Sequence, residues 1–415
     1  MAIDWSRLNI DPVALQAQID QLGEVGAGPE GLYRPVYGEA WIEAMDLLDG
    51  WFADAGLVRR RDPMGSLIGR VEGTAPERVV LVGSHVDTVR MGGRYDGALG
   101  VLAGLASVRA LLSAFGPPRK TLEVIGLCEE EGSRFPAPFW GSRGICGRIG
   151  RDEADLLLDG EGVSIGEAMR AVGLTPERIP DAKRHDIDAF FELHIEQGPV
   201  LENEHVDLGI PHTITGLRQI RVTVSGRQDH AGTTPMDLRL DPVVATADMI
   251  GRIAAAARTR GRPAVATIGF IGVLPGAVNV VAQEVSFTVD TRHSDADLRR
   301  RLIADIEQTV DEVGRLHGVK TEITILTDHE PVPLDDSLRS VLRDAATEES
   351  LSYLEIASGA GHDSQVFAQH VPTAMVFVPS QSGRSHTPEE HTPIEQVIPG
   401  IRTLSRALHH LAYAK

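Results

Sequence analysis

Four short apolar runs in this chain end in the same way, with polar and chemically reactive residues at their carboxyl ends. The runs lie at 77–87, 121–132, 189–198 and 373–386. Each starts with strand-forming residues and closes with histidine, aspartate or glutamate. In open α/β sheets, ligands bind at the carboxyl ends of the strands. The pattern therefore predicts an α/β domain whose strands contribute to one composite site.

The segment between about 212 and 329 has a different pattern. Strand-like and helix-like stretches alternate in the order β-α-β-β-α-β, which predicts a compact α+β module inserted into the α/β domain. Prolines mark its edges, at Pro211 and at Pro331–Pro333, and we interpret them as hinges. We therefore expect one domain from 1–211 and 330–415, and a second from 212–329. The strands expected in the module are 218–226, 264–273, 284–292 and 320–328, and its helices are 241–259 and 295–318.

Length and composition fit a globular protein of more than one domain. At about 100–200 residues per domain, 415 residues predict two or three domains. A hydrophobic fraction of 42% excludes disorder as the main state. We see no run of about 18 apolar residues and no signal-peptide pattern, so we expect no membrane partner. The N-terminal segment 1–75 is expected to be helical, with one helix over 41–57 that stops at Gly56.

The charge balance limits the possible partners. Forty Lys and Arg face 59 Asp and Glu, which gives a net charge of −19. A nucleic-acid-binding protein needs a basic footprint, and the one short cluster, Arg59–Arg61, is best interpreted as a solvated face. The acidic excess fits either bound metal or simple solubility. Two cysteines, Cys128 and Cys146, exclude a disulfide framework and favour a reducing, cytoplasmic location.

His85 and Asp87 close the first run and form a pair typical of metal sites. A metal-bound histidine usually donates its second ring N–H to a carboxylate, which fixes its tautomer. Asp96 follows in GGRYDGALG, where glycines allow close approach to an ion. An ordinary strand-to-helix loop is the alternative interpretation.

Three adjacent glutamates, Glu129, Glu130 and Glu131, follow the second run. Adjacent carboxylates repel each other and are costly to bury without a cation. They form either a solvated acidic surface or a site where one binds metal and its neighbour acts as a general base. His194 and His386 close the third and fourth runs. Histidine and carboxylate ligands without cysteine suit zinc, manganese, cobalt or nickel.

Four residues of the inserted module are candidates for substrate binding. Since the metal ligands are anionic, a substrate carboxylate needs cations from elsewhere, and arginine is the natural partner. Arg292 ends a strand of the module, and we expect Asn279 close to it. A surface salt bridge is the alternative for each arginine. The four candidates are Arg218, His230, Asn279 and Arg292.

Seven motifs, in order, resemble the hydantoinase/carbamoylase-type di-metal amidohydrolases of the aminoacylase/carboxypeptidase superfamily. They are GSHVDTV, YDGALG, EEEGSRF, ELHIEQGPVLE, DHAGTTPM, NVV…FTVDTRH and SGAGHDS…SH.P. The resemblance runs from about residue 20 to the C-terminus. It implies a mixed-sheet α/β catalytic domain with an inserted ferredoxin-like α+β domain that serves as lid and dimerisation surface. It also implies two divalent ions, zinc or else manganese, cobalt or nickel.

The resemblance further implies a role for each candidate residue. Asp96 would bridge both ions, Asp87 would orient His85, and Glu129 would be the general base, with a shift of one position left open. His230 would help to stabilise the oxyanion. The implied metal ligands are His85, Asp96, Glu130, His194 and His386. The implied substrate-binding residues are Gln197, Arg218, His230, Asn279 and Arg292.

The implied reaction is hydrolysis of the terminal ureido C–N bond of a small ureido acid, with release of ammonia and carbon dioxide. FWGS at 139–142, TRHSDAD at 291–297 and EPVP at 330–333 resemble allantoate amidohydrolases more than carbamoylases. An N-carbamoyl-L-amino acid hydrolase or a β-ureidopropionase is the alternative. A non-catalytic homologue that binds a ureido acid is a further one, although no expected ligand is missing. Peptidases of the superfamily lack the EEEGSRF and HIEQG motifs.

Overall fold

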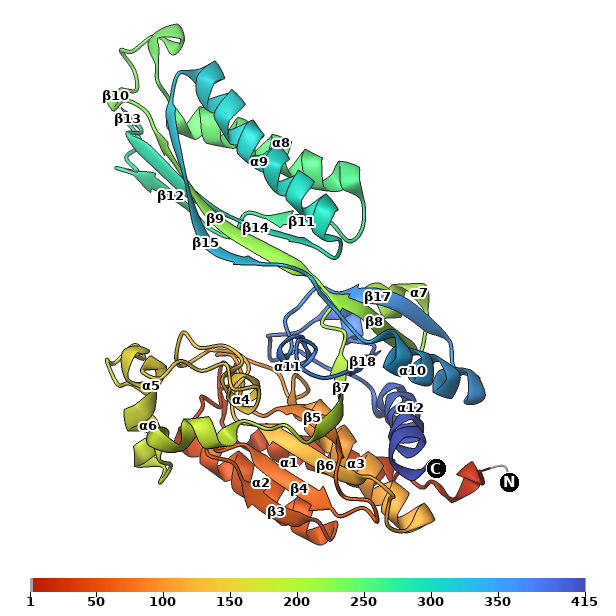
Figure 1. Ribbon diagram of the computed structural model, residues 1–415. Coiled ribbons are helices and arrows are strands. Elements are labelled where there is room, and N and C mark those ends of the chain that lie inside the picture. Colours follow the sequence, from red (N-terminus) through yellow and green to blue (C-terminus); the bar gives the residue numbers. More distant parts are fainter. Residues whose placement is uncertain (1–2, 415) are drawn as a thin grey trace. The chain divides into compact units, whose positions relative to one another are not determined.

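The computed structural model, which describes residues 3–414, divides into two compact units, each with its own hydrophobic core (Figure 1). The units meet in the chain near the expected prolines, but the boundaries differ from the expected ones. In particular, the smaller unit has a short second segment, which the sequence pattern did not indicate. The larger unit contains the chain up to His212, Leu334–Ile356 and the chain from His362; the smaller unit contains Thr213–Pro333 and Ala357–Gly361.

A nine-stranded mixed sheet has most of its strands in the larger unit, whereas its residues 213–214, Val332–Pro333 and 357–358 belong to the smaller one. Its strand order is β16-β8-β18-β7-β5-β6-β4-β3, with β17 also paired to β8. The four central strands β18, β7, β5 and β6 are parallel to their neighbours in this group. The bounds are β3 (Val58–Arg61), β4 (Leu67–Val71), β5 (Val79–His85), β6 (Thr121–Leu127), β7 (Ile187–Ile195), β8 (Leu208–Ile214), β16 (Val332–Pro333), β17 (Tyr353–Ser358) and β18 (Thr373–Val378).

These four parallel strands are the four apolar runs of the sequence, so that prediction is confirmed. Their residues are almost entirely buried, as expected for parallel strands covered on both faces. Because the strands are parallel, their carboxyl ends lie along the same edge of the sheet. The polar residues that follow them are therefore brought together by the topology alone.

The helices of the larger unit include long ones that cover the sheet and short ones in the connections. Their bounds are η1 (Trp5–Arg7), α1 (Pro12–Glu24), α2 (Glu39–Asp54), α3 (Ala98–Phe115), α4 (Trp140–Ile145), α5 (Glu153–Leu156), α6 (Ile165–Ala171), η2 (Pro176–Ala182), α7 (Val200–Glu204), α10 (Asp336–Glu348), α11 (Asp363–Phe367), η4 (Gln381–Gly383) and α12 (Ile394–Tyr413). A small two-stranded sheet, β1 (Ala27–Gly28) with β2 (Gly31–Leu32), joins α1 to α2.

The expectation that segment 1–75 is helical is wrong for part of its length. Two helices, α1 and α2, are present, but strands β3 and β4 follow them at the edge of the sheet. Arg59–Arg61 forms most of β3, where all its residues are exposed and ion pairs reach Asp46 and Asp49. An exposed edge strand carries no apolar pattern, which is why the sequence did not reveal it.

Helix α3 contradicts the expectation that no apolar stretch is long enough to cross a membrane. By length and composition alone it could do so. In the structure, however, 72% of that stretch is buried, and the helix packs against β5, β6, β7 and α12. The core helix of a folded domain meets the same criterion, and α3 has that role here.

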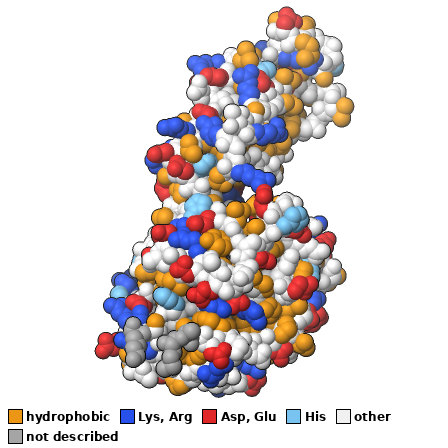
Figure 2. Space-filling model, turned by 90° about the vertical axis from the view of Figure 1, so that its right-hand side faces the viewer, with side chains coloured by type: hydrophobic (Ala, Val, Ile, Leu, Met, Phe, Trp, Pro, Cys, Tyr) orange, Lys and Arg blue, Asp and Glu red, His pale blue; other side chains and the backbone are white. Residues whose placement is uncertain are grey.

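On the face shown in Figure 2, acidic and basic side chains are intermixed over the larger unit, which gives no basic footprint there.

The smaller unit is a five-stranded antiparallel sheet of order β11-β14-β9-β15, with β12 also paired to β14. Two helices, α8 and α9, supply the rest of its core, which includes Val222, Met249 and Phe287. The predicted β-α-β-β-α-β order is confirmed, with the segment 264–273 split into β11 and β12. The bounds are β9 (Gly216–Ser225), β10 (Asp229–His230), η3 (Met236–Leu238), α8 (Pro242–Arg260), β11 (Val265–Thr267), β12 (Ile271–Leu274), β13 (Val280–Val281), β14 (Glu284–His293), α9 (Ala296–His317) and β15 (Lys320–His329).

Candidate metal centre

Asp96 lies at the centre of the group of residues that the parallel strands bring together. Its Oδ1 is 3.4 Å from Nε2 of His85 at the end of β5, and 3.1 Å from Nε2 of His194 in β7. Its other oxygen, Oδ2, is 3.2 Å from Nε2 of His386, which follows β18. One carboxylate therefore faces three imidazoles, two through one oxygen and the third through the other.

The possible ligand atoms form two groups that share Asp96. His85, Asp96 and His194 make the first group, and all three are buried. Asp96, Glu131 and His386 make the second. Within each group the ligand atoms lie within 4.8 Å of one another. Two histidine- and carboxylate-rich groups joined by one carboxylate fit a pair of divalent ions bridged by Asp96.

The structure places Glu131, not Glu130, in the group with Asp96 and His386. Glu131 Oε1 is 3.5 Å from Nε2 of His386. Glu130 instead forms a separate group with His85 and Glu131, and its side chain is almost buried. Glu129 is fully buried, and neither of its carboxylate oxygens has a hydrogen-bond partner among the described residues. This geometry favours the register one position later than the one that the resemblance implies, in which Glu130 is a ligand and Glu129 the base.

Asp87, which follows the neighbouring strand β5, holds the backbone of the triplet. Its two oxygens accept hydrogen bonds from the backbone N–H groups of Glu130, at 2.9 Å, and Glu131, at 3.1 Å. Its backbone oxygen is 3.1 Å from Nδ1 of His85. Since a carbonyl can only accept, Nδ1 of His85 carries the proton in that contact and Nε2 is left free to bind an ion. The Asp87 carboxylate also lies near His85, with 3.3 Å between Oδ1 and Nδ1, as expected, and it has a second role at the triplet backbone.

Two backbone features position His85 and His194 relative to Asp96. Nδ1 of His194 is 2.9 Å from the backbone oxygen of Ile195, which likewise leaves its Nε2 toward Asp96. Gly97, with φ +64°, lies just before α3 and close to the His85 ring. A Cβ at this position would lie 2.4 Å from that ring, so only glycine allows Asp96 and His85 to approach this closely.

Gln197 lies beside the candidate metal ligands, as the resemblance implies. Its Nε2 donates to Oδ2 of Asp96 at 2.7 Å. Two residues that the sequence analysis missed, Ser385 and Glu390, complete the surroundings. The Ser385 hydroxyl is 3.0 Å from Oδ2 of Asp96, and Glu390 accepts the backbone N–H groups of Tyr95 and Asp96. The acidic pair in SHTPEEH was the available signal for Glu390.

A third possible ligand group lies behind His194 and consists of Glu192, His194 and His362. Glu192 is already satisfied, because it accepts hydrogen bonds from the hydroxyls of Ser84 and Ser364, each at 2.6 Å. The His362 ring packs edge-on against the His194 ring, with 4.6 Å between their centroids. We interpret this group as support for the His194 ring.

The electrostatics of the centre reflect an excess of carboxylates. Burial raises the pKa of Asp96, but His194, His386 and His85 outweigh it and hold that pKa well below its ordinary value. The hydrogen bond to Asp96 is the main cause that raises the pKa of His386 to about 9. Burial and repulsion from Asp96 raise the pKa of Glu131 to about 7. Divalent cations would relieve this repulsion, so the residues present fit such ions.

The candidates in the smaller unit fall into two separate places. The β10–β13 pairing sets His230 opposite Val280, and the Ala231 N–H donates to the Asn279 carbonyl at 3.0 Å, so His230 and Asn279 are neighbours. Arg292 is at the other end of β14, eight residues and about 26 Å beyond Glu284. The expectation that Asn279 lies close to Arg292 is therefore wrong.

Both arginines have partners within the smaller unit. Arg292 binds both oxygens of Asp290, at 2.9 and 3.1 Å, and its Nη1 donates to the backbone oxygen of Gly359 at 2.6 Å. Arg218 pairs with Asp328 at 2.6 Å and with Glu307 at 2.9 Å. These are the salt bridges that the sequence left open as the alternative. A substrate carboxylate would have to compete with them.

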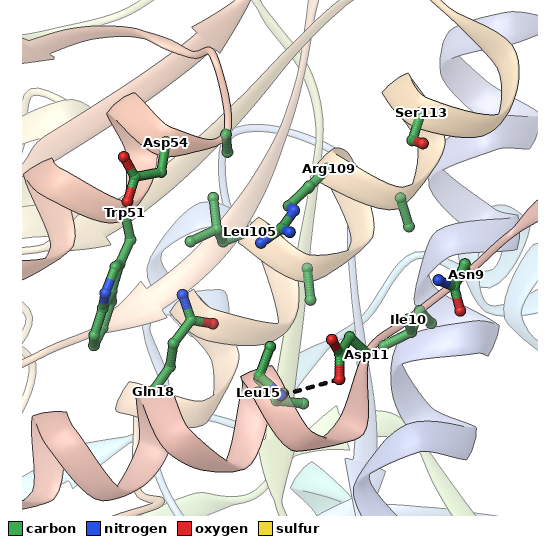
Figure 3. Close-up of a pocket in the computed structure, with 14 residues that line it drawn as sticks. Asn9, Ile10, Asp11, Leu15, Gln18, Trp51, Asp54, Leu105, Arg109 and Ser113 are labelled. Atoms are coloured by element: carbon green, nitrogen blue, oxygen red, sulfur yellow. Dashed lines mark hydrogen bonds between the residues drawn. The ribbon is translucent and has the colours of Figure 1, made fainter.

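A pocket of about 230 Å³ lies among α1, α2 and α3 and shares no residue with the metal centre (Figure 3). Its walls combine apolar side chains such as Leu15 and Leu105 with Trp51 and the polar Gln18 and Arg109. None of the residues predicted for catalysis or binding lines it. We therefore treat it as separate from the site.

Comparison with known proteins identifies the family of the chain. Residues 81–410 match the model of peptidase family M20/M25/M40. Allantoate amidohydrolase of Escherichia coli is 40% identical over 97% of this chain and 98% of its own length. N-carbamoyl-L-amino-acid amidohydrolase of Paenarthrobacter aurescens is also 40% identical, over 96% and 97%. A hydantoinase/carbamoylase family amidase from Burkholderia ambifaria superposes with a TM-score of 0.91 at 34% identity, over 98% of this chain and 100% of that one. The chain therefore belongs to peptidase family M20/M25/M40 and, within it, to the amidohydrolases of the hydantoinase/carbamoylase type, which confirms the resemblance of its motifs.

Proposed function

We propose that this chain hydrolyses the terminal ureido C–N bond of a small ureido acid at two divalent ions bridged by Asp96, with allantoate as the preferred substrate. The observation that carries the proposal is the pair of ligand groups that share Asp96. Similar full-length relatives act on ureido compounds: two are named allantoate amidohydrolases and three N-carbamoyl-L-amino-acid amidohydrolases. Zinc suits the ligands, and manganese, cobalt or nickel are alternatives.

The proposed ligands revise the register within the glutamate triplet. His85 and His194 would hold one ion, Glu131 and His386 the other, and Asp96 both. When bound, such ions lower the pKa of a water and polarise the ureido oxygen. In each of His85 and His194, a backbone carbonyl accepts a hydrogen bond from Nδ1–H. Nε2 would therefore be the nitrogen that binds the ion.

We assign the general base to Glu130. Its carboxyl group is close to the ligands His85 and Glu131 without being part of either bridged group. Burial raises the pKa of Glu130 well above its ordinary value, opposed by His85 and assisted by Glu131. A raised pKa suits a group that takes a proton from water and returns it to the leaving nitrogen near neutral pH. Loss of the carbamoyl group then gives ammonia, carbon dioxide and the freed amine.

Substrate recognition is assigned to residues beside the ions and in the smaller unit. Gln197 would orient the ureido group, since its amide already donates to Asp96. Arg292, and Arg218 as the alternative, would bind the substrate carboxylate by exchanging an intramolecular partner for it. His230 would stabilise the oxyanion, with Asn279 beside it.

We also propose a cytoplasmic homodimer formed through the smaller unit. Within residues 3–414, strand β12 pairs with β14 alone. It exposes Ile271, at 53%, and Leu274, at 60%, and Phe270 just before it is exposed as well. An edge strand with apolar side chains is a template for pairing with another chain. Both cysteines are free and buried, as expected in a reducing compartment.

A substrate panel tests the choice of substrate. Ammonia release would be measured with allantoate, several N-carbamoyl-L-amino acids, N-carbamoyl-β-alanine and ureidoglycolate, because relatives named ureidoglycolate hydrolase are also similar. We expect the highest kcat/KM with allantoate. A higher value with a carbamoyl amino acid would replace it with the alternative. Binding without turnover of any member would instead favour a non-catalytic homologue.

A further inference from the structure

Arg34, between β2 and α2, is a fully buried arginine next to the metal centre. Among the described residues, its side chain donates no hydrogen bond to any of the proposed ligands. Instead its Nε donates to the backbone oxygen of Val86 at 3.0 Å, and its Nη1 donates to the oxygens of Leu22, at 2.9 Å, and Val25, at 3.3 Å. The guanidinium thus joins the residue between His85 and Asp87 to the end of α1.

The backbone of Arg34 binds the same segment a second time. Its N–H donates to Oγ1 of Thr88 at 2.9 Å, and its carbonyl accepts the Thr88 N–H at 3.3 Å. Residues 86–88 are therefore held by a side-chain contact at one end and two contacts to Thr88 at the other. Such a segment cannot shift without breaking several buried hydrogen bonds.

The buried charge of Arg34 is compensated at Nε and Nη1, while its Nη2 has no hydrogen-bond partner among the described residues. Its Nη1 lies against the last carbonyls of α1 (Pro12–Glu24), where the helix dipole is negative. Burial lowers the pKa of Arg34 to about 10, while Asp87 and Glu390 oppose that change, so the group stays charged at neutral pH. A permanently charged, planar donor is well suited to binding several carbonyls at once.

We propose that Arg34 is a positioning residue of the metal centre: it ties residues 86–88 to α1 and so holds His85 and Asp87 in place relative to Asp96. This inference rests on the proposed function, since it concerns the same ions. Asp87 matters in two ways, because it contacts His85 and also accepts the N–H groups of Glu130 and Glu131. Movement of residues 86–88 would therefore disturb ligands of both ions.

Zn²⁺ affinity of the folded, metal-free protein, measured by competition with a chromogenic chelator, tests the inference. We expect the dissociation constant to rise about tenfold or more in both Arg34→Lys and Arg34→Met, the range found when groups that support a ligand are removed. Lysine keeps the charge but cannot bind three carbonyls, so it should not rescue. Arg299→Met is the matched control: Arg299 is a buried arginine of the smaller unit that binds the Leu217 oxygen, and its loss should lower the melting temperature without changing Zn²⁺ affinity.

The possible outcomes distinguish a failure of the proposed metal centre from a failure of the positioning role of Arg34. If the unmodified protein binds no Zn²⁺, the metal centre itself is wrong, and the role of Arg34 with it. If it binds Zn²⁺ and both Arg34 variants bind equally well, or if lysine restores full affinity, the positioning role is overturned while the metal centre stands. Should both variants fail to fold, Thr88→Val removes one contact to Arg34 and is expected to weaken Zn²⁺ binding; unchanged affinity there also overturns the inference.

Discussion

Single residues at the metal centre are held by partners distant in sequence, and this decides what the sequence could reveal. The residues that the structure groups around Asp96 were predictable from the motifs, because His85, Asp96, His194 and His386 each stand in a distinct pattern. The glutamate triplet was not, since three identical side chains in a row carry no local signal. The side chain that reaches His386 is decided by contacts between residues far apart in the sequence, and the backbone of the triplet is held by Asp87, from a different and much earlier motif.

Substitutions in the triplet test that register. Glu130→Gln should keep bound metal and lose turnover by about 10²–10⁴-fold, because a positioned base is removed. Glu131→Gln should lose the ion that Glu131 would hold together with His386. Metal content by mass spectrometry and kcat measured on the same samples would distinguish the two. If Glu129→Gln removes turnover while Glu130→Gln removes metal, the register is the one that the resemblance implies.

His386 predicts how metal binding depends on pH. Its pKa is raised to about 9, chiefly by Asp96, but an ion needs the neutral ring. Affinity for the ion at His386 should therefore rise with pH and level off above about pH 9, with proton release on binding. Calorimetry in two buffers of different ionisation enthalpy measures that proton. Affinity that does not change between pH 6.5 and 9 would contradict this account.

The raised pKa of His386 also affects the free energy of unfolding of the metal-free protein. This contribution falls as the pH rises, whereas metal affinity increases. The folded-state pKa of His386 lies above its ordinary value of 6.5, so the folded state binds the proton more tightly. Its contribution to stability is complete below about pH 6.5 and is lost as the pH rises through about 9. The affinity for the ion at His386 therefore increases over the same pH range in which the contribution of His386 to stability is lost.

Elements with a clear apolar period were predictable, and elements defined by their neighbours were not. The four parallel strands and the helices α8 and α9 follow from local patterns. Strand β3 is exposed along its whole length, so only its pairing with β4 makes it a strand. The neighbouring positions of His230 and Asn279 likewise depend on the pairing of β10 with β13, two strands that α8 and further strands separate in the sequence.

Strand β12 carries the prediction for assembly. Ile271→Lys should shift the protein from dimer to monomer, because a charged side chain on an exposed edge strand opposes pairing. Sedimentation velocity at micromolar concentration measures this. Leu316→Lys, at an exposed apolar position on α9, is the matched control and should leave the dimer intact. An unmodified protein that is monomeric, or a variant that remains dimeric, would contradict the role of β12.

At the scale of the whole molecule, one sheet edge collects carboxylates that the chain cannot bury without compensation. The net charge of −19 and the buried Asp87, Asp96, Glu129 and Glu130 are parts of the same feature. Histidines and the buried Arg34 compensate part of it, and divalent ions would compensate the rest. Binding to the folded state alone should also raise the melting temperature as ion concentration increases.

The most direct test of the two-ion centre is the number and position of bound ions together with activity. Protein freed of metal by chelation would be titrated with Zn²⁺ or Mn²⁺ while ammonia release is followed, and a crystal would be examined for anomalous scattering. We predict two ions per chain, on either side of Asp96, with ureido hydrolysis lost on chelation and restored as they bind. Hydrolysis that survives complete chelation, or ions bound away from Asp96, would contradict the account.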